Sequence, residues 1–138
     1  MKFNNFTIDE EKFIIYNLDI GKSYNTLISD IITDGTINIL DKKDQIVDRN
    51  SLVKTGDVIS FKYNVYDEEY KISVLGDVTG TGDLNIGDVA KLYSSVKGKF
   101  DLNGEFKLAG DVTLNREIDL GDVSKLYSYL RNKIPSLN

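Results

Sequence analysis

Apolar and polar residues alternate along much of the first half of the chain, which is the pattern of a β-strand with one buried face. The clearest run extends from Ile59 to Val65, where every second residue is apolar. Comparable runs predict further strands over residues 13–20, 36–40, 45–47 and 70–75. Polar residues between the runs predict turns at 41–44 and 67–69.

A short helix is expected between the first two strands. Ser23 is a favourable N-cap, and Leu27, Ile28 and Ile31 follow it as apolar residues of the helix. Together these elements predict a small β-rich α+β module over residues 1–75. No proline- or glycine-rich linker follows, so we expect this module to pack rigidly on the second half of the chain.

The second half is an internal repeat. Residues 76–99 and 110–133 align without a gap, and about half of the aligned positions are identical. Arrays of helical hairpins are also self-similar, but they normally need three or more repeats to bury a core. The two copies are therefore interpreted as a duplicated binding motif in which a polar loop precedes a helix.

Each loop places an oxygen-bearing side chain at positions 1, 3, 5, 9 and 12, counted from its first aspartate. In the first loop these residues are Asp77, Thr79, Thr81, Asn85 and Asp88. In the second loop they are Asp111, Thr113, Asn115, Asp119 and Asp122. With the backbone carbonyl of Asp83 or Glu117 at position 7, this spacing matches the ligands of an EF-hand and predicts two Ca²⁺ sites.

The sharp turn at position 6 distinguishes the two loops. Gly82 allows a positive φ in the first loop, whereas Arg116 in the second would adopt it at a cost on the order of 1 kcal/mol. The second loop has three ligand carboxylates and the first has two. We expect both loops to bind Ca²⁺ at extracellular, near-millimolar levels. The alternative is that one loop is only a turn held by Asp and Thr side chains.

The helix of each repeat carries an apolar stripe. The stripes are Val89, Leu92 and Val96 in the first repeat and Val123, Leu126 and Leu130 in the second, and we expect them to pack on each other. Leu84 and Ile118, at position 8, are expected to point into the core and to pair the loops through a short β-bridge. The second helix should end before Pro135.

The amino-acid composition limits the kinds of functional site and partner that can be expected. The 138 residues include no Cys and no His, which excludes zinc fingers and nucleophilic sites that need either residue. The net charge is −5 and no basic stripe is present, so nucleic acid is not expected as a partner. No apolar run has the length needed to span a bilayer.

The repeats, GDVTGTGDLNIGDVAKLYSSV and GDVTLNREIDLGDVSKLYSYL, resemble those of dockerins, the calcium-binding modules of cellulosome-type enzymes. The resemblance covers residues 76 to about 137, and the first half is similar to the X-type modules that precede some dockerins. It implies an α+β chain in which the β-rich module packs on an all-α dockerin, residues 76–138, made of two EF-hand-like loop–helix repeats.

The same resemblance implies binding to the cohesin domain of a scaffoldin or cell-surface protein, in a secreted setting. The residues carried over are Ile86, Gly87, Ala90, Tyr93, Ser94 and Lys97, and in the second repeat Leu120, Gly121, Ser124, Tyr127, Ser128 and Arg131. Five residues of the first set also lie on the helix face opposite the core stripe, namely Ile86, Ala90, Tyr93, Ser94 and Lys97. The alternative is that Tyr93 and Tyr127 fill the core. The duplication implies that either face docks after a half-turn.

No catalytic residue is predicted, and the chain alone is expected to be a monomer. A calcium-stabilised stalk or a carbohydrate-binding appendage of a glycosidase is the alternative function, and an exposed aromatic platform on the first half would favour it. A small glycosidase with paired carboxylates is disfavoured because the loops already account for the acidic residues.

Overall fold

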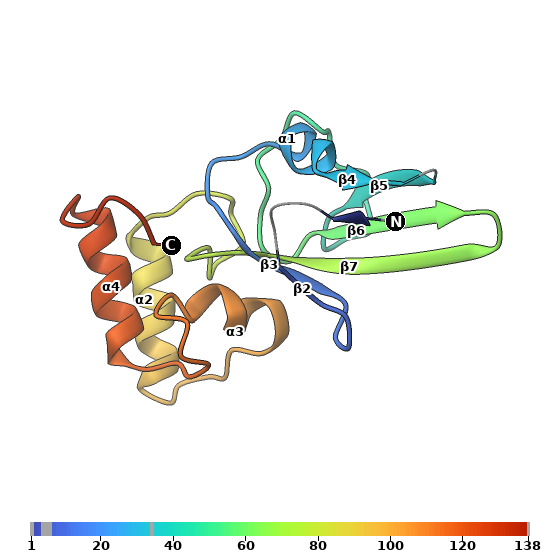
Figure 1. The fold of residues 1–138 in the computed structure, drawn as a ribbon. Helices are drawn as coiled ribbons and strands as arrows, with labels where there is room; N and C mark the ends of the chain where they lie inside the picture. The colour runs from blue at the N-terminus through green and yellow to red at the C-terminus, as the bar shows by residue number, and fades with distance from the viewer. Residues whose placement is uncertain (1, 4–6, 34, 138) are drawn as a thin grey trace.

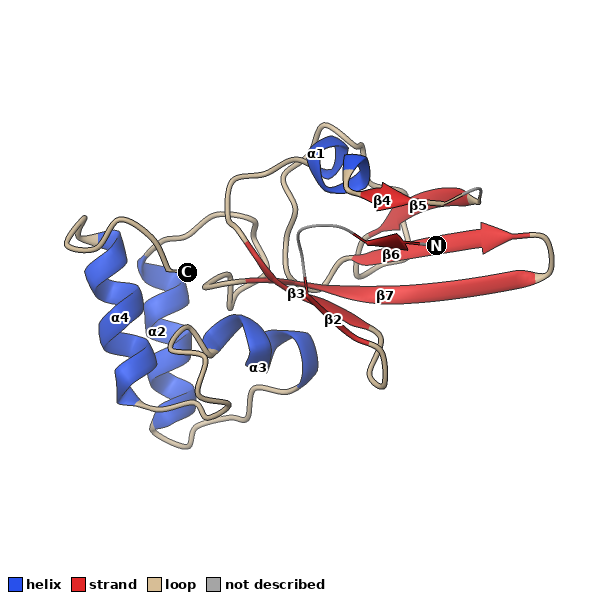
Figure 2. Ribbon diagram, viewed as in Figure 1, coloured by secondary structure: helices blue, strands red, loops and turns tan. Residues whose placement is uncertain are grey.

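The computed structural model describes residues 2–3, 7–33 and 35–137, and within these ranges its centre is a mixed five-stranded sheet (Figure 1). The strand order is β2 (Thr7–Asp9), β3 (Ile14–Leu18), β7 (Tyr66–Val74), β6 (Val58–Tyr63) and β5 (Thr36–Leu40). A separate two-stranded sheet pairs β1 (Lys2–Phe3) with β4 (Ile31–Ile32). The helices are α1 (Tyr24–Ser29), α2 (Ile86–Val96), α3 (Gly104–Gly110) and α4 (Leu120–Leu130). Figure 2 shows α2, α3 and α4 gathered at one end of the sheet.

Strands β3 and β7 are parallel, whereas the other neighbours in the five-stranded sheet are antiparallel. Ile15 lies beside Ile72, and both side chains are fully buried. Parallel strands cannot be joined by a hairpin, and here α1, β4, β5 and β6 lie in the connection between them. The strand predicted over residues 13–20 is confirmed as β3, but its pairing with β7 was not part of the prediction.

The predicted turn at residues 67–69 is wrong. Strand β7 begins at Tyr66, which pairs with Tyr63 of β6, so Asn64 and Val65 form the turn. Asn64 has a φ of 53°, a left-handed conformation that asparagine adopts more readily than most residues. The three acidic residues that follow are exposed on the strand.

Two other boundaries differ from the prediction. Residues 45–47 form no strand, because Ile46 makes only an isolated bridge to Leu40. Ser23 caps α1 as predicted and accepts a hydrogen bond from the backbone N–H of Thr26. The helix ends at Ser29, however, so Ile31 belongs to β4.

Buried apolar residues form two clusters. The first fills the space around the five-stranded sheet and α1, and includes Ile15, Ile59 and Ile72. The second joins α2 to α4, with Leu92 and Leu126 fully buried at its centre. The predicted packing of the two helical stripes is therefore confirmed, with Val89 buried and Val123 and Leu130 partly buried at its edge. Val96 is half-buried, and α4 ends before Pro135 as predicted.

The predicted fold class is wrong. Over the described residues the chain is a mixed five-stranded sheet with four helices, 27% helical and 25% strand, and not a β-rich module beside an all-α dockerin. Helix α3 packs directly on β3 and β7. Ser73 of β7 donates a hydrogen bond to the Glu105 carbonyl of α3 at 2.7 Å, and the Gly76 N–H donates to the Ala109 carbonyl at 2.8 Å. Helical periodicity within the repeats could not indicate that the segment between them would lie against the sheet. The predicted boundary after residue 75 stays a prediction.

Candidate metal centre

The two polar loops have the same backbone conformation. Positions 4 and 6 of the first loop, Gly80 and Gly82, have φ values of 74° and 80°. Their counterparts Leu114 and Arg116 have φ values of 61° and 70°. The left-handed conformation predicted for Arg116 is thus confirmed, and both loops turn at the same two positions.

The aspartate at position 1 is held by the backbone of its own loop. Asp77 accepts hydrogen bonds from the N–H groups of Thr81 and Gly82, both at 3.1 Å. Asp111 accepts the equivalent bonds from Asn115 at 3.1 Å and Arg116 at 2.7 Å. The sharp turn is what brings both N–H groups to one carboxylate.

The aspartate at position 12 closes each loop from within the following helix. Asp88 of α2 accepts two hydrogen bonds from Thr79, one from its N–H at 3.0 Å and one from its hydroxyl at 2.7 Å. It also accepts a hydrogen bond from the N–H of Asn85 at 3.0 Å. Asp122 of α4 accepts the equivalent bonds from Thr113 and Asp119 at 2.8 to 3.0 Å. Both aspartates are fully buried.

The residues at positions 5, 7 and 9 bond to each other or to the helix. Thr81 Oγ1 donates to the Asp83 carbonyl at 3.2 Å, and Asn115 Nδ2 donates to Asp119 Oδ2 at 3.3 Å. Asn85 and Asp119 at position 9 are the N-caps of α2 and α4, each within a capping box. At position 7 of the second loop, the Glu117 N–H donates to Asn115 Oδ1 at 3.0 Å.

Burial shapes the electrostatics of these carboxylates. Burial raises the pKa of Asp77, and the charge of Asp88 raises it further, while N–H groups of Thr55 and Gly82 act in the opposite direction. Burial likewise raises the pKa of Asp122, with Asp111 adding to the effect. Each loop therefore holds two negative charges close enough to repel each other, which a bound cation would relieve.

The donor set suits a hard cation. Among the described residues, no three His, Cys, Asp or Glu side chains form a group that could hold a metal ion. The first loop instead combines two carboxylates, and the second three, with hydroxyl, amide and carbonyl oxygens, and oxygen ligands of this kind are those that Ca²⁺ binds. The chemistry of the predicted ligands suits Ca²⁺, and the side chains at position 9, Asn85 and Asp119, also cap α2 and α4.

One contact to the first loop was missed by sequence reasoning. The N–H of Thr55, in the segment before β6, donates to Asp77 Oδ2 at 3.0 Å. A Cβ at Gly80 would lie 2.6 Å from the Thr55 carbonyl oxygen. Leu114, at the same position of the second loop, is 50% exposed. The glycine at position 4, in the first loop only, was a signal of this contact.

The predicted bridge between the loops is not formed. In the described part of the chain, isolated bridges join Ser23 to Leu52 and Leu40 to Ile46. Leu84 and Ile118 do pack against the helical cluster, as half-buried side chains. The loops are therefore joined through the core rather than through backbone pairing.

Large side chains of the predicted partner-binding sets are exposed. Ile86 and Leu120 are 64% and 59% exposed, and Tyr93 and Tyr127 are 44% and 43% exposed. The tyrosines therefore do not fill the core. The remaining residues are exposed (Ala90, Lys97, Gly121, Ser124 and Arg131) or half-buried (Gly87, Ser94 and Ser128).

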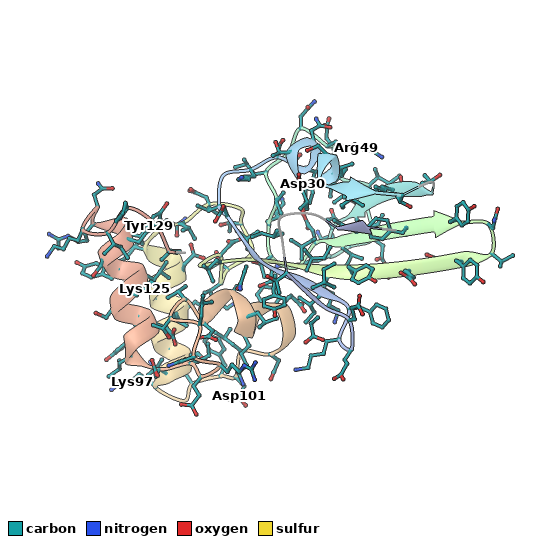
Figure 3. All side chains as sticks on the ribbon, viewed as in Figure 1. Asp30, Arg49, Lys97, Asp101, Lys125 and Tyr129 are labelled. Carbon is teal, nitrogen blue, oxygen red and sulfur yellow. The ribbon has the colours of Figure 1, made fainter. Side chains whose placement is uncertain are left out.

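A cation covers each tyrosine. The Lys97 ammonium lies 5.6 Å from the centre of the Tyr93 ring, and the Arg131 guanidinium lies 5.6 Å from that of Tyr127. Arg131 also donates to Tyr127 Oη at 3.0 Å. Figure 3 shows Lys97 at the lower end of the helical part. The two helices thus carry matching pairs of an aromatic ring and a cation.

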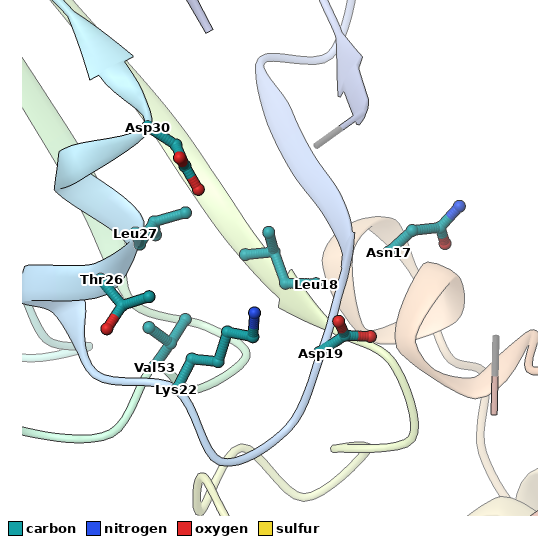
Figure 4. A pocket seen from close by; sticks show the side chains of 8 residues that line it. All are labelled: Asn17, Leu18, Asp19, Lys22, Thr26, Leu27, Asp30 and Val53. Atoms are coloured by element: carbon teal, nitrogen blue, oxygen red, sulfur yellow. The ribbon is translucent and has the colours of Figure 1, made fainter. Parts of the chain in front are cut away.

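A separate hollow of about 220 Å³ lies between β3 and α1. Asp19 and Lys22 come from the segment after β3, and Asp30 from the end of α1 (Figure 4). None of its lining residues belongs to the predicted metal-binding or partner-binding sets.

Comparison with known proteins adds no assignment. No protein-family model matches this chain. A search of the curated proteins likewise found no match. Within the described ranges, none of the helices has the length and apolar character needed to cross a membrane.

Proposed function

We propose that this chain is a non-catalytic interaction module that holds two structural Ca²⁺ ions and binds a cohesin domain. It anchors a secreted enzyme in a multi-enzyme or cell-surface complex. The matched geometry of the two loops is the observation that supports this most strongly. In both loops, the carboxylates at positions 1 and 12 accept the same set of hydrogen bonds from the backbone of their own loop.

Calcium would be held by the oxygen ligands of the two loops. The bound ion supplies positive charge that offsets the repulsion between the paired carboxylates, so its binding is coupled to folding. Position 12 belongs to α2 or α4, and each ligand set therefore fixes the start of one helix. With the N-terminal ends of α2 and α4 both fixed, the positions of their exposed faces relative to each other are also fixed.

The exposed faces of α2 and α4 are the proposed cohesin-binding surface. Each presents an aliphatic residue at its start and a tyrosine two turns later, namely Ile86 with Tyr93 and Leu120 with Tyr127. Exposed tyrosines flanked by cations are typical anchors of protein interfaces. Because the faces are near-duplicates, the module binds through either of them.

A direct test is capture of the purified chain by a panel of immobilised cohesin domains, with Ca²⁺ and then with excess chelator. The proposal predicts capture by at least one cohesin, and release when Ca²⁺ is removed. Failure of every cohesin to capture the calcium-loaded chain would contradict the proposed partner.

A second candidate is a calcium-stabilised appendage that binds polysaccharide. It is favoured by Tyr63 and Tyr66, which pair across the end of the β6–β7 hairpin and are 48% and 70% exposed. Sedimentation with insoluble polysaccharide separates the two functions. Binding that is lost in Tyr63→Ala and Tyr66→Ala, without capture by cohesin, would favour the appendage.

A further inference from the structure

A basic cleft of about 380 Å³ lies where the β2–β3 hairpin faces α3 and the second loop. Three cationic side chains line it, and each comes from a different segment: Lys12 from the β2–β3 turn, Lys107 from α3 and Arg116 from the second loop. Figure 1 shows α3 beside these strands. The cleft thus gathers positive charge on a chain whose net charge is −5.

The three cations have no partner within the cleft. Among the described residues, Lys12, Lys107 and Arg116 form no ion pair and no side-chain hydrogen bond. All three residues are exposed. Their donors are therefore available to a ligand.

Two carboxylates also line the cleft, and both already accept backbone N–H groups. Asp9 Oδ1 accepts the N–H groups of Glu11 and Lys12 at 3.1 and 3.0 Å. The two oxygens of Asp111 accept those of Asn115 and Arg116, and the residue is only 6% exposed. These amides occupy acceptor sites of the two carboxylates, and the three cationic side chains leave the cleft with an excess of one positive charge.

We propose that the basic cleft binds an oxyanion, either free or as the acidic group of a sugar. Lysine and arginine make charge-assisted hydrogen bonds to carboxylate and sulfate oxygens, and arginine can make two at once. The partly buried Tyr16 also lines the cleft and offers a hydroxyl donor. Ile14 and Leu108 give it an apolar wall, against which the C–H face of a sugar ring fits.

The test is a titration of the full calcium-loaded chain at constant ionic strength, followed by two-dimensional NMR. Sodium sulfate, sodium glucuronate and glucose are the probes. Saturable changes in the NMR chemical shifts of the three cationic residues are expected with at least one of the two anions, and no such changes are expected with glucose. Tighter binding of glucuronate assigns the site to acidic sugars, and equal or tighter binding of sulfate assigns it to free oxyanions. Absence of saturable binding of both anions at millimolar concentrations would overturn the proposal.

Variants locate the site. Lys107→Gln combined with Arg116→Gly should weaken anion binding at least tenfold. Arg116→Gly gives the second loop the residue that the first has at Gly82, so the loop conformation should persist. The matched control, Lys99→Gln with Lys133→Gln, removes the same charge outside the cleft and should change the affinity less than about twofold. The assignment would be overturned if both double variants lost the same anion affinity, or if Lys107→Gln with Arg116→Gly lost none. Lys12→Gln should also weaken anion binding, as an independent third variant.

Discussion

At the scale of single residues, position 4 of each loop shows how a contact from elsewhere in the fold decides which side chain is tolerated. Gly80 and Leu114 share a left-handed backbone, but only Gly80 lies against the Thr55 carbonyl. The first loop has no space for a Cβ, whereas the second directs an exposed leucine toward solvent. The same conformation therefore imposes different constraints in the two repeats.

This difference predicts that Gly80→Ala lowers the free energy of unfolding by about 2 kcal/mol or more, because it combines a positive φ with a backbone clash. Leu114→Ala, at the matching position, keeps a non-glycine residue in the same conformation and should cost less than about 1 kcal/mol. Denaturant unfolding of both variants in saturating Ca²⁺ checks this. Equal losses would show that the Thr55 contact is unimportant.

Asp57 is a buried carboxyl outside the two loops. Tyr24 Oη donates to Asp57 Oδ2 at 2.5 Å, and both residues are almost completely buried. Burial raises the pKa of Asp57, although the bond from Tyr24 acts in the opposite direction. Burial and the bond to Asp57 raise the pKa of Tyr24 well above its usual range.

The raised pKa of Asp57 has a definite consequence for stability. Between the unfolded and the folded pKa the native state binds more protons, so the contribution of Asp57 to stability falls as the pH rises. Relative to Asp57→Asn, the parent chain should therefore gain stability as the pH falls from neutral towards 4. Denaturant unfolding at a series of pH values, in saturating Ca²⁺, measures this difference.

Asp41 is the control of opposite sign. The N–H groups of Gln45 and Lys43 lower the pKa of its carboxyl. Its contribution to stability is present above the unfolded pKa and is lost as the pH falls. Asp41→Asn should therefore become relatively less harmful in acid. Curves for the parent and Asp57→Asn that stay parallel across the pH range would contradict the account of Asp57.

At the scale of elements, the features that could be predicted are those set by neighbouring residues. The turn at position 6 of each loop, the Ser23 cap of α1 and the apolar stripes of α2 and α4 follow from local spacing, and the structure has all of them. The parallel pairing of β3 with β7 and the position of α3 on the sheet depend on residues far apart in the sequence. The turn at Asn64 was missed because the acidic residues after it resemble a turn more strongly.

The exposed faces of α2 and α4 lead to a prediction about binding. The double variant Tyr93→Ala with Tyr127→Ala should weaken cohesin binding about 30-fold or more, because exposed tyrosines are frequent hot spots. Either single change should cost only about twofold, since the other face remains available. Calorimetry with cohesin measures the losses, and the Ca²⁺ affinity should be unchanged.

Tyr66→Ala is the matched control for this experiment. Tyr66 is equally aromatic and more exposed, but it lies on the β6–β7 hairpin rather than on either helix face. Its removal should leave cohesin binding intact. If the double variant binds as well as the parent chain, the two tyrosines are not in the interface.

At the scale of the whole molecule, the sheet and the helical repeats have separate cores but shared hydrogen bonds. The cluster around the sheet contains no residue of the repeats, whereas the helical cluster depends on helices whose starts belong to the loops. Thr55 and Ser73 connect the two parts through Asp77 and α3. A conformational change in the first loop is therefore expected to affect the sheet mainly through Thr55.

This arrangement predicts an unequal response to chelation. Removal of Ca²⁺ should reduce the helical circular dichroism signal of residues 76–138, because the paired carboxylates then repel each other. Part of the sheet should stay folded on its own core. Hydrogen exchange with and without chelator distinguishes the two parts, and an unchanged helical signal would count against calcium-dependent folding.

Calorimetric titration of the chelator-treated chain with Ca²⁺ examines the proposed metal sites most directly. Two ions per chain are expected. Asp88→Asn or Asp122→Asn should each remove one of them, and the two changes together should remove both. A parent chain that takes up no Ca²⁺ at millimolar concentrations, or takes up the same number of ions after both aspartates are replaced, would contradict the account.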